Sequence, residues 1–142
     1  MLRVIFDTNV LVAGLRSSSG ASFALLESLP SEHFQLALSV PLYVEYQDVL
    51  LRRDVKPRGI TNRQMLEFLR YIASISSHHA IYFLWRPFLR DPKDDMVLEL
   101  AVAAQCSHIV THNTRDFVGV EQFGLQAVTP AVFYGLTQER EL

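Results

Sequence analysis

The chain has 142 residues, which is long enough for one domain with a substantial core. Of these residues 49% are hydrophobic and 20% are charged, so the apolar side chains for that core are present. A formal net charge of −2 excludes a generally basic surface, so a polyanion would have to be held by a local patch or through metal ions. A single cysteine excludes a disulfide framework and indicates a reducing, cytoplasmic setting. No apolar run is long enough to span a membrane, and the N-terminus lacks a signal-peptide pattern.

Segments with strand patterns alternate along the chain with segments in which apolar residues recur at helical spacing. Strands are predicted at residues 2–6, 34–38, 79–85, 108–111 and 125–128. Helices are predicted from residue 8, over 21–29 and 40–53, from 62, over 92–106 and from 130. This alternation indicates a parallel sheet covered by helices on both faces. No repeat or linker divides it, so residues 1–142 are expected to form a single α/β domain.

Several predicted helices begin with capping residues. A serine is available to cap the helix that follows the first loop. Ser39 can cap the helix after the second strand, and Thr61 can form a capping box with Gln64. Asp91 followed by Pro92 is the N-cap pattern of a further helix.

The first strand ends directly at an acidic residue, Asp7, which Thr8 and Asn9 follow. In open α/β sheets, ligands bind at the carboxyl ends of the strands, and an acid there is well placed to face a cation. The alternative is that Asp7 is simply the N-cap of a helix that begins at Thr8. These residues alone leave both roles open.

The segment 91–95 contains three aspartates, two of which have local roles. Asp91 is the N-cap and Asp94 occupies the third helical position, where a negative charge complements the helix dipole. Asp95 is left over, and it shares a stripe with Glu99 one turn later on an otherwise apolar helix. That acidic stripe must meet either a cation or water, and a solvated stripe is the alternative.

Two further acids are candidates for the same site. Glu45 lies at the border of the apolar face of its helix, where it could look into a cleft or be solvated. Asp116 follows the fourth strand in a polar loop with Asn113, and its alternative role is an Asx-turn.

Carboxylates gathered together repel one another unless cations neutralise them. Oxygen ligands select hard ions such as Mg²⁺ or Mn²⁺, which serve phosphoryl transfer.

Taken in order, these acidic segments resemble the PIN-domain family, and within it the bacterial and archaeal toxins of toxin–antitoxin systems. The resemblance rests on residues 6–10 around Asp7, on Glu45 six residues after Ser39, and on residues 91–95 followed by 98–101. It also rests on residues 109–117, which have the form Thr-x-Asn-x-x-Asp-Phe. No single match is specific, but all of them occur in order at the expected separations.

The resemblance implies a three-layer α/β/α sandwich with a mostly parallel central sheet. It implies an endoribonuclease that uses Mg²⁺ or Mn²⁺ for in-line attack of water on RNA, with an antitoxin protein as partner and a homodimer as assembly. The implied catalytic and metal-binding residues are Asp7, Glu45, Asp95 and Asp116, with supporting roles for Thr8, Asn9, Asp94, Glu99 and Asn113. Asp95 is preferred to Asp94 because Asp94 has a capping role and because counting back from Thr111 leads to Asp95.

Basic residues are candidates for contacting RNA phosphates, although a solvated basic face is the commoner role of such a cluster. They are Arg52, Arg53, Lys56, Arg58 and Arg115. Apolar runs at 82–85 and 132–134 are candidates for protein contacts, with core packing as the commoner explanation.

Two other functions compete with this prediction. A phosphatase of the haloacid-dehalogenase type also begins with a strand that ends in aspartate, but its second acid is replaced here by Asn9, which cannot exchange a proton. A catalytically silent module that binds only RNA or protein is the other alternative, and the presence of all four acids argues against it.

Overall fold

The computed structural model describes residues 1–81 and 88–140. Its centre is a five-stranded sheet in the order β3-β2-β1-β4-β5, in which all neighbouring strands are parallel. The strands are β1 (Leu2–Phe6), β2 (Phe34–Leu38), β3 (Ser77–His78), β4 (His108–Val110) and β5 (Gln126–Val128). The predicted parallel sheet is therefore confirmed.

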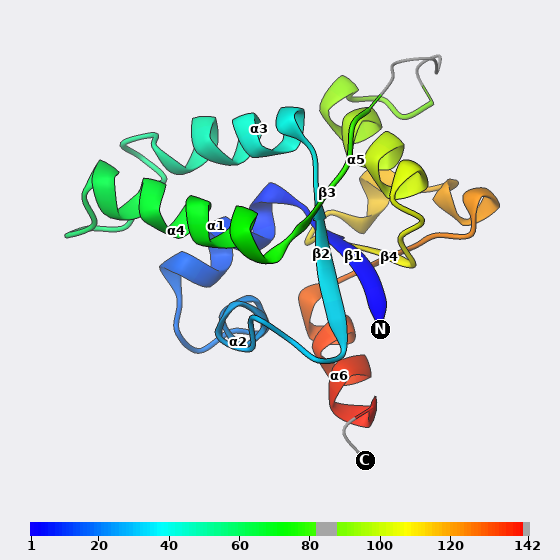
Figure 1. Cartoon of the computed structure of the whole chain (residues 1–142), viewed down its shortest axis with the longest axis horizontal. Helices are drawn as coiled ribbons and strands as arrows, with labels where there is room; N and C mark the ends of the chain where they lie inside the picture. Colours follow the sequence, from blue (N-terminus) through cyan, green and yellow to red (C-terminus); the bar gives the residue numbers. More distant parts are fainter. Residues whose placement is uncertain (82–87, 141–142) are drawn as a thin grey trace.

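Helices cover both sides of this sheet, as predicted. They are α1 (Thr8–Arg16), α2 (Ala21–Glu27), α3 (Val40–Leu50), α4 (Asn62–Ile75), α5 (Pro92–Ala103) and α6 (Pro130–Arg140), with 3-10 helices η1 (Thr114–Phe117) and η2 (Val120–Phe123). Figure 1 shows α1 and α2 on one side of the strands and α5 on the other. Within the described residues, no helix has both the length and the apolar character needed to cross a membrane.

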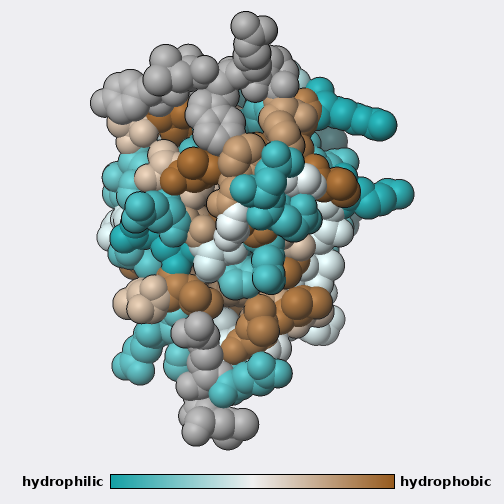
Figure 2. All heavy atoms as spheres, turned by 90° about the vertical axis from the view of Figure 1, so that its right-hand side faces the viewer, coloured by the Kyte–Doolittle hydropathy of each residue, from teal (hydrophilic) through white to brown (hydrophobic). Residues whose placement is uncertain are grey.

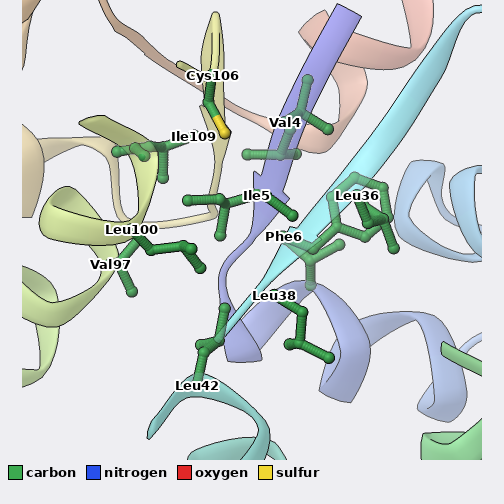
Figure 3. Packing of buried hydrophobic residues seen from close by; sticks show 14 of the residues in the cluster. Val4, Ile5, Phe6, Leu36, Leu38, Leu42, Val97, Leu100, Cys106 and Ile109 are labelled. Carbon is green, nitrogen blue, oxygen red and sulfur yellow. The ribbon is translucent and has the colours of Figure 1, made fainter. Parts of the chain in front are cut away.

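The two faces of the sheet have different partners because side chains alternate along each strand. On one face, the ring of Phe34 lies 5.8 Å from that of Phe6 and 5.1 Å from that of Phe133 in α6. On the other face, Ile5 pairs in register with Ile109. Figure 3 shows Ile5 directed toward the side of the sheet on which Val97 and Leu100 of α5 lie. Together these contacts form one continuous core.

The capping predictions hold with one exception. Ser39, Thr61 and Asp91 each accept a backbone N–H at the start of their helices, and Thr61 forms the full capping box. The predicted serine cap of α2 is wrong, because the N-cap is Gly20 and has no side chain to accept a hydrogen bond. α3 ends at Leu50 rather than near residue 53.

The third strand begins earlier than predicted. β3 comprises Ser77 and His78, and its position is fixed by parallel pairing with Ala37 and Leu38 of β2. The β-rich composition of residues 79–85 carried no information about this pairing. Residues 82–87 lie outside the described part of the chain, and so do the predicted contact run 82–85 and most of the predicted strand.

Helix α1 approaches α2 closely at Gly14. A Cβ atom at this position would lie 2.5 Å from Leu26 Cδ1 and 3.1 Å from the backbone oxygen of Ser22. At Gly135, in the middle of α6, a Cβ atom would have no neighbour within 4 Å. The two glycines therefore form a matched pair, one with a packing role and one without.

We expect Gly14→Ala to lower the free energy of unfolding by about 1–3 kcal/mol, because the new methyl group forces α1 and α2 apart. Gly135→Ala should raise it by about 0.5–1 kcal/mol, because alanine loses less backbone entropy in a helix. Urea unfolding of both variants measures the difference. Equal stability of the two variants would show that the close approach of α1 and α2 is not needed.

Candidate active site

The carboxyl ends of β1 and β4 lie side by side in the sheet, at the point where the order in which strands are added reverses. From β1 the chain adds β2 and β3 on one side, whereas β4 and β5 lie on the other. Phe6 pairs with Val110, and the Asp7 N–H continues the ladder by donating to the Val110 carbonyl at 2.9 Å. The residues that follow these two strands are therefore neighbours at a topological switch point, where ligands bind in open α/β sheets.

Asp7 is held by hydrogen bonds to both carboxylate oxygens. Its Oδ1 accepts the Thr8 N–H at 2.9 Å, which makes Asp7 the N-cap of α1. Its Oδ2 accepts from the Thr111 hydroxyl at 2.8 Å and from Asn9 Nδ2 at 3.3 Å. Asp7 is thus the cap and also a residue at the switch point, so the two roles considered from the sequence are compatible. Asn9 serves as a hydrogen-bond donor to Asp7.

Glu45 approaches the same place from α3. Its Oε2 accepts a hydrogen bond from the Thr8 hydroxyl at 2.6 Å. The next residue, Tyr46, is buried and donates its hydroxyl to the Phe6 carbonyl, so α3 is tied directly to the end of β1. Burial, and then the charges of Asp7 and Glu45, raises the pKa of Tyr46 well above its usual value, which keeps the hydroxyl a neutral donor.

Asp7 and Glu45 line one cleft of about 390 Å³ that opens at the carboxyl ends of the strands. Acids from separate segments face it, together with polar and apolar groups. The lining comprises Asp7, Thr8, Asn9, Val12, Glu45, Val49, Val55, Asp91, Lys93, Asp94, Asn113 and Asp116. We call this cavity the acid cleft. Within the described chain, the Asp116 side chain has no hydrogen-bond partner, so the Asx-turn alternative does not describe it.

Of the three aspartates at the start of α5, Asp91 and Asp94 line the acid cleft, whereas the sequence favoured Asp95. Asp95 is not part of the lining, because its Oδ1 instead accepts the backbone N–H groups of Phe88 at 3.1 Å and Leu89 at 2.8 Å. Glu99 also lies away from the cleft, buried beside Asp95 and without a hydrogen bond to its Oε2 among the described residues. The acidic stripe of α5 therefore meets backbone amides and the protein interior.

The charges in the acid cleft destabilise one another. Burial, and after it the neighbouring charges of Asp7, Asp91, Asp116 and Glu45, together raise the pKa of Asp94 to about 7. Burial also raises the pKa of Asp7, against the hydrogen bonds from Thr111 and Thr8, which lower it. Lys93 is the only cation among the described lining residues. A group of acids with so little neutralisation has the donor set and charge of a site for a hard divalent cation.

The carboxylates surround the acid cleft without meeting at one point. Among the described residues, no three acidic, histidine or cysteine side chains are close enough to form a ready-made metal site. The acids differ in how firmly they are held. Asp7 is fixed by its hydrogen bonds, whereas Asp94 and Asp116 have no side-chain hydrogen bond in the described chain. The side chains of Asp94 and Asp116 are therefore less constrained than that of Asp7.

The other predicted site residues fall into two groups. Thr8, Asn9 and Asn113 line the acid cleft, as expected of supporting groups. The basic residues Arg52, Arg53, Lys56 and Arg58 lie in the turns after α3, next to the cleft through Val55, whereas Arg115 lines a neighbouring cleft. Thr111 was not predicted as a site residue, although a threonine at the end of a buried strand is a signal that could have identified it.

Comparison with known proteins identifies a family and a fold for the chain. Residues 3–115 match the family model described as the PIN domain. VapBC2 from Rickettsia felis, solved bound to a DNA fragment from its promoter, is similar with 15% identity and a TM-score of 0.60, covering 90% of this chain and 98% of that one. FitAB bound to an IR36 DNA fragment is similar with 18% identity and a TM-score of 0.61, covering 89% and 94%.

No curated protein matches the chain by sequence. The family model nevertheless covers most of the chain, including α3, α5 and the ends of β1 and β4, around which the acid cleft lies. At these low identities, the two solved structures support the fold alone. On the family match, together with the five-stranded parallel sheet, the chain belongs to the PIN-domain family.

Proposed function

We propose that this PIN domain is an endoribonuclease that depends on Mg²⁺ or Mn²⁺ and acts as the toxin of a toxin–antitoxin pair. The observation that carries the proposal is the convergence of acids from the end of β1, from α3, from the start of α5 and from η1 on one cleft with little positive charge. Membership of a family that typically comprises nucleases supports hydrolysis of phosphodiester bonds as the reaction. The resemblance to toxins and the structural likeness to VapBC2 and FitAB support an antitoxin protein as partner.

The residues proposed to hold the cation are Asp7, Glu45, Asp94 and Asp116. When bound, a divalent cation supplies charge neutralisation for the scissile phosphate and acidifies the attacking water. Asp7 contributes a carboxylate whose orientation is fixed by the hydroxyl of Thr111 and the backbone of Thr8. That fixed orientation means little reorganisation is needed when substrate arrives, which is how preorganised polar groups lower a barrier.

Glu45 and Thr8 form the second fixed element. The short hydrogen bond from the Thr8 hydroxyl leaves the other oxygen of Glu45 available to the acid cleft. Asn113 is positioned by its backbone N–H, which donates to the Thr111 hydroxyl at 3.0 Å. Its side-chain amide lines the cleft and is proposed to orient a phosphate oxygen. Attack of water on phosphorus in line with the departing 3′-oxygen gives a 5′-phosphate and a 3′-hydroxyl.

Adjacent aspartates on α5 provide the sharpest test of the site. We expect Asp94→Asn to lower Mn²⁺-dependent cleavage of a panel of structured RNAs by at least about 100-fold, because it removes a cleft carboxylate. Asp95→Asn is the matched control, since asparagine keeps the oxygen that accepts the Phe88 and Leu89 amides. Asp7→Asn should be as inactive as Asp94→Asn.

The opposite ranking, with Asp95→Asn inactive and Asp94→Asn active, would return the third site position to Asp95. Full activity of Asp7→Asn and Asp94→Asn together would remove the assignment of the acid cleft. Trapping of an acid-labile phosphate on Asp7 would favour the phosphatase alternative.

The raised pKa of Asp94 predicts how stability depends on pH in the presence of a chelator. In the folded protein this pKa is about 7, against an ordinary value of 3.8, so the folded state binds the proton more tightly than the unfolded chain. The protonated form is therefore favoured by folding, and stability falls as pH rises from about 4 to 7. Asp94→Asn should flatten this part of the pH profile.

Mn²⁺ should reverse the loss, because the cation stabilises the ionised carboxylates. Thermal melts across this pH range, with chelator and with Mn²⁺, measure both effects. A melting temperature that is insensitive to Mn²⁺ above pH 7 would contradict cation binding by these acids.

A further inference from the structure

A second cleft of about 590 Å³ adjoins the acid cleft, and Asp116 lines both. It lies between the segment that precedes α5 and the 3-10 helix that follows β4. The described residues that line it are Phe88, Leu89, Arg90, Arg115, Asp116 and Val118. Its volume is within the range of about 300–1,000 Å³ that is usual for ligand pockets. The two clefts are therefore neighbours that share the side chain of Asp116.

The second cleft differs in charge from the first. Arg90 and Arg115 both line it and are exposed, and within the described chain neither has an ion-pair or hydrogen-bond partner. Unpaired guanidinium groups at the rim of a cleft are available to bind phosphate oxygens in a bidentate manner. The step from an acidic to a basic lining suits a phosphodiester chain, with one phosphate at the acids and the next at the arginines.

Phe88 presents an aromatic ring to this cleft. The residue is 42% exposed, although its ring packs edge-on against Phe123 with 5.3 Å between the ring centres and an interplanar angle of 78°. Gly119 allows this position, because its φ is +100° and a Cβ atom there would lie 3.2 Å from the Phe88 ring. An exposed aromatic ring held by packing on one side is the form of a stacking platform for a nucleic acid base.

Asp95 holds this platform in place. Its Oδ1 accepts the N–H groups of Phe88 and Leu89 together, and it stands next to Asp94 in the first turn of α5. The carboxylate of Asp94 therefore lines the acid cleft, whereas the neighbouring Asp95 holds the backbone that carries Phe88 at the second cleft. Figure 2 shows hydrophilic and hydrophobic residues interspersed on the face of the molecule on the α5 side of the sheet.

We propose that the second cleft binds the nucleotide next to the scissile phosphate, with its base stacked on Phe88 and its phosphate held by Arg90 and Arg115. This inference rests on the proposed nuclease function and makes the substrate single-stranded at that nucleotide. A base inside a duplex is stacked on both faces and cannot also stack on a side chain. Asp95 is then a positioning residue and not a ligand of the cation.

The test measures binding separately from cleavage. Wild-type protein and variants are titrated into fluorescently labelled oligouridylate with Ca²⁺ in place of Mn²⁺, and into an abasic ribose-phosphate chain of the same length. Phe88→Leu keeps apolar bulk without an aromatic face, and Phe88→Tyr keeps the face. Tyr71→Leu is a matched control, because Tyr71 is an aromatic residue of similar exposure, 41%, on the distant helix α4.

We expect Phe88→Leu to weaken oligouridylate binding by about tenfold, as loss of one stacked base predicts, and to leave binding of the abasic chain unchanged. Phe88→Tyr and Tyr71→Leu should bind both ligands like wild type. Arg115→Ala should weaken both ligands and reduce the salt dependence of binding. Thermal melts of each variant establish that it is folded.

Equal binding of oligouridylate by wild type and a folded Phe88→Leu variant would overturn the stacking site. Equal losses for both ligands would also overturn it, because a stacking platform acts only on the base. Phe88-dependent binding without any Mn²⁺-dependent cleavage would instead support the subsite while contradicting the proposed nuclease function. Tight binding of an oligouridylate–oligoadenylate duplex in preference to the single strand would contradict the single-stranded substrate.

Discussion

The repulsion among carboxylates at the shared end of β1 and β4 is the constraint on which the site depends. Parallel pairing of these two strands brings Asp7 and Thr111 together, and the Thr111 hydroxyl then fixes the Asp7 carboxylate. The buried, hydrogen-bonded tyrosine of α3 brings Glu45 to the same cleft. The stability that the core contributes therefore offsets the repulsion among the carboxylates of the acid cleft.

The two clefts divide the chemistry of a phosphodiester substrate. The acid cleft has the charge and the oxygen donors for a hard cation, whereas the adjoining cleft has arginines and an aromatic ring. Asp116 lines both clefts, while in the first turn of α5 Asp94 lines the acid cleft and Asp95 holds the backbone of Phe88, which lines the other. Proposed cation binding and proposed base binding are therefore consequences of the same short helix start and the same loop after β4.

Much of the fold could be predicted because local patterns and tertiary structure agree. The alternation of strands and helices, the capping residues and the order of acidic segments are all local signals, and each corresponds to an element of the structure. β3 could not be placed, because its position depends on pairing with β2 and not on its own composition. That Asp94 lines the acid cleft and Asp95 does not could not be predicted, for a similar reason. A helical projection gives the direction in which the Asp95 side chain points. It does not show that the backbone N–H groups of residues 88 and 89 lie there and donate hydrogen bonds to the carboxylate.

The most direct test of the account is a crystal structure of the protein with Mn²⁺, in which anomalous scattering locates the ion independently of any activity. The account predicts an anomalous peak in the acid cleft, with oxygen ligands from Asp7 and Asp94 and with Asp95 still bound to the amides of Phe88 and Leu89. An acid cleft without manganese at saturating concentration, or an ion held by Asp95 outside it, would contradict the central claim.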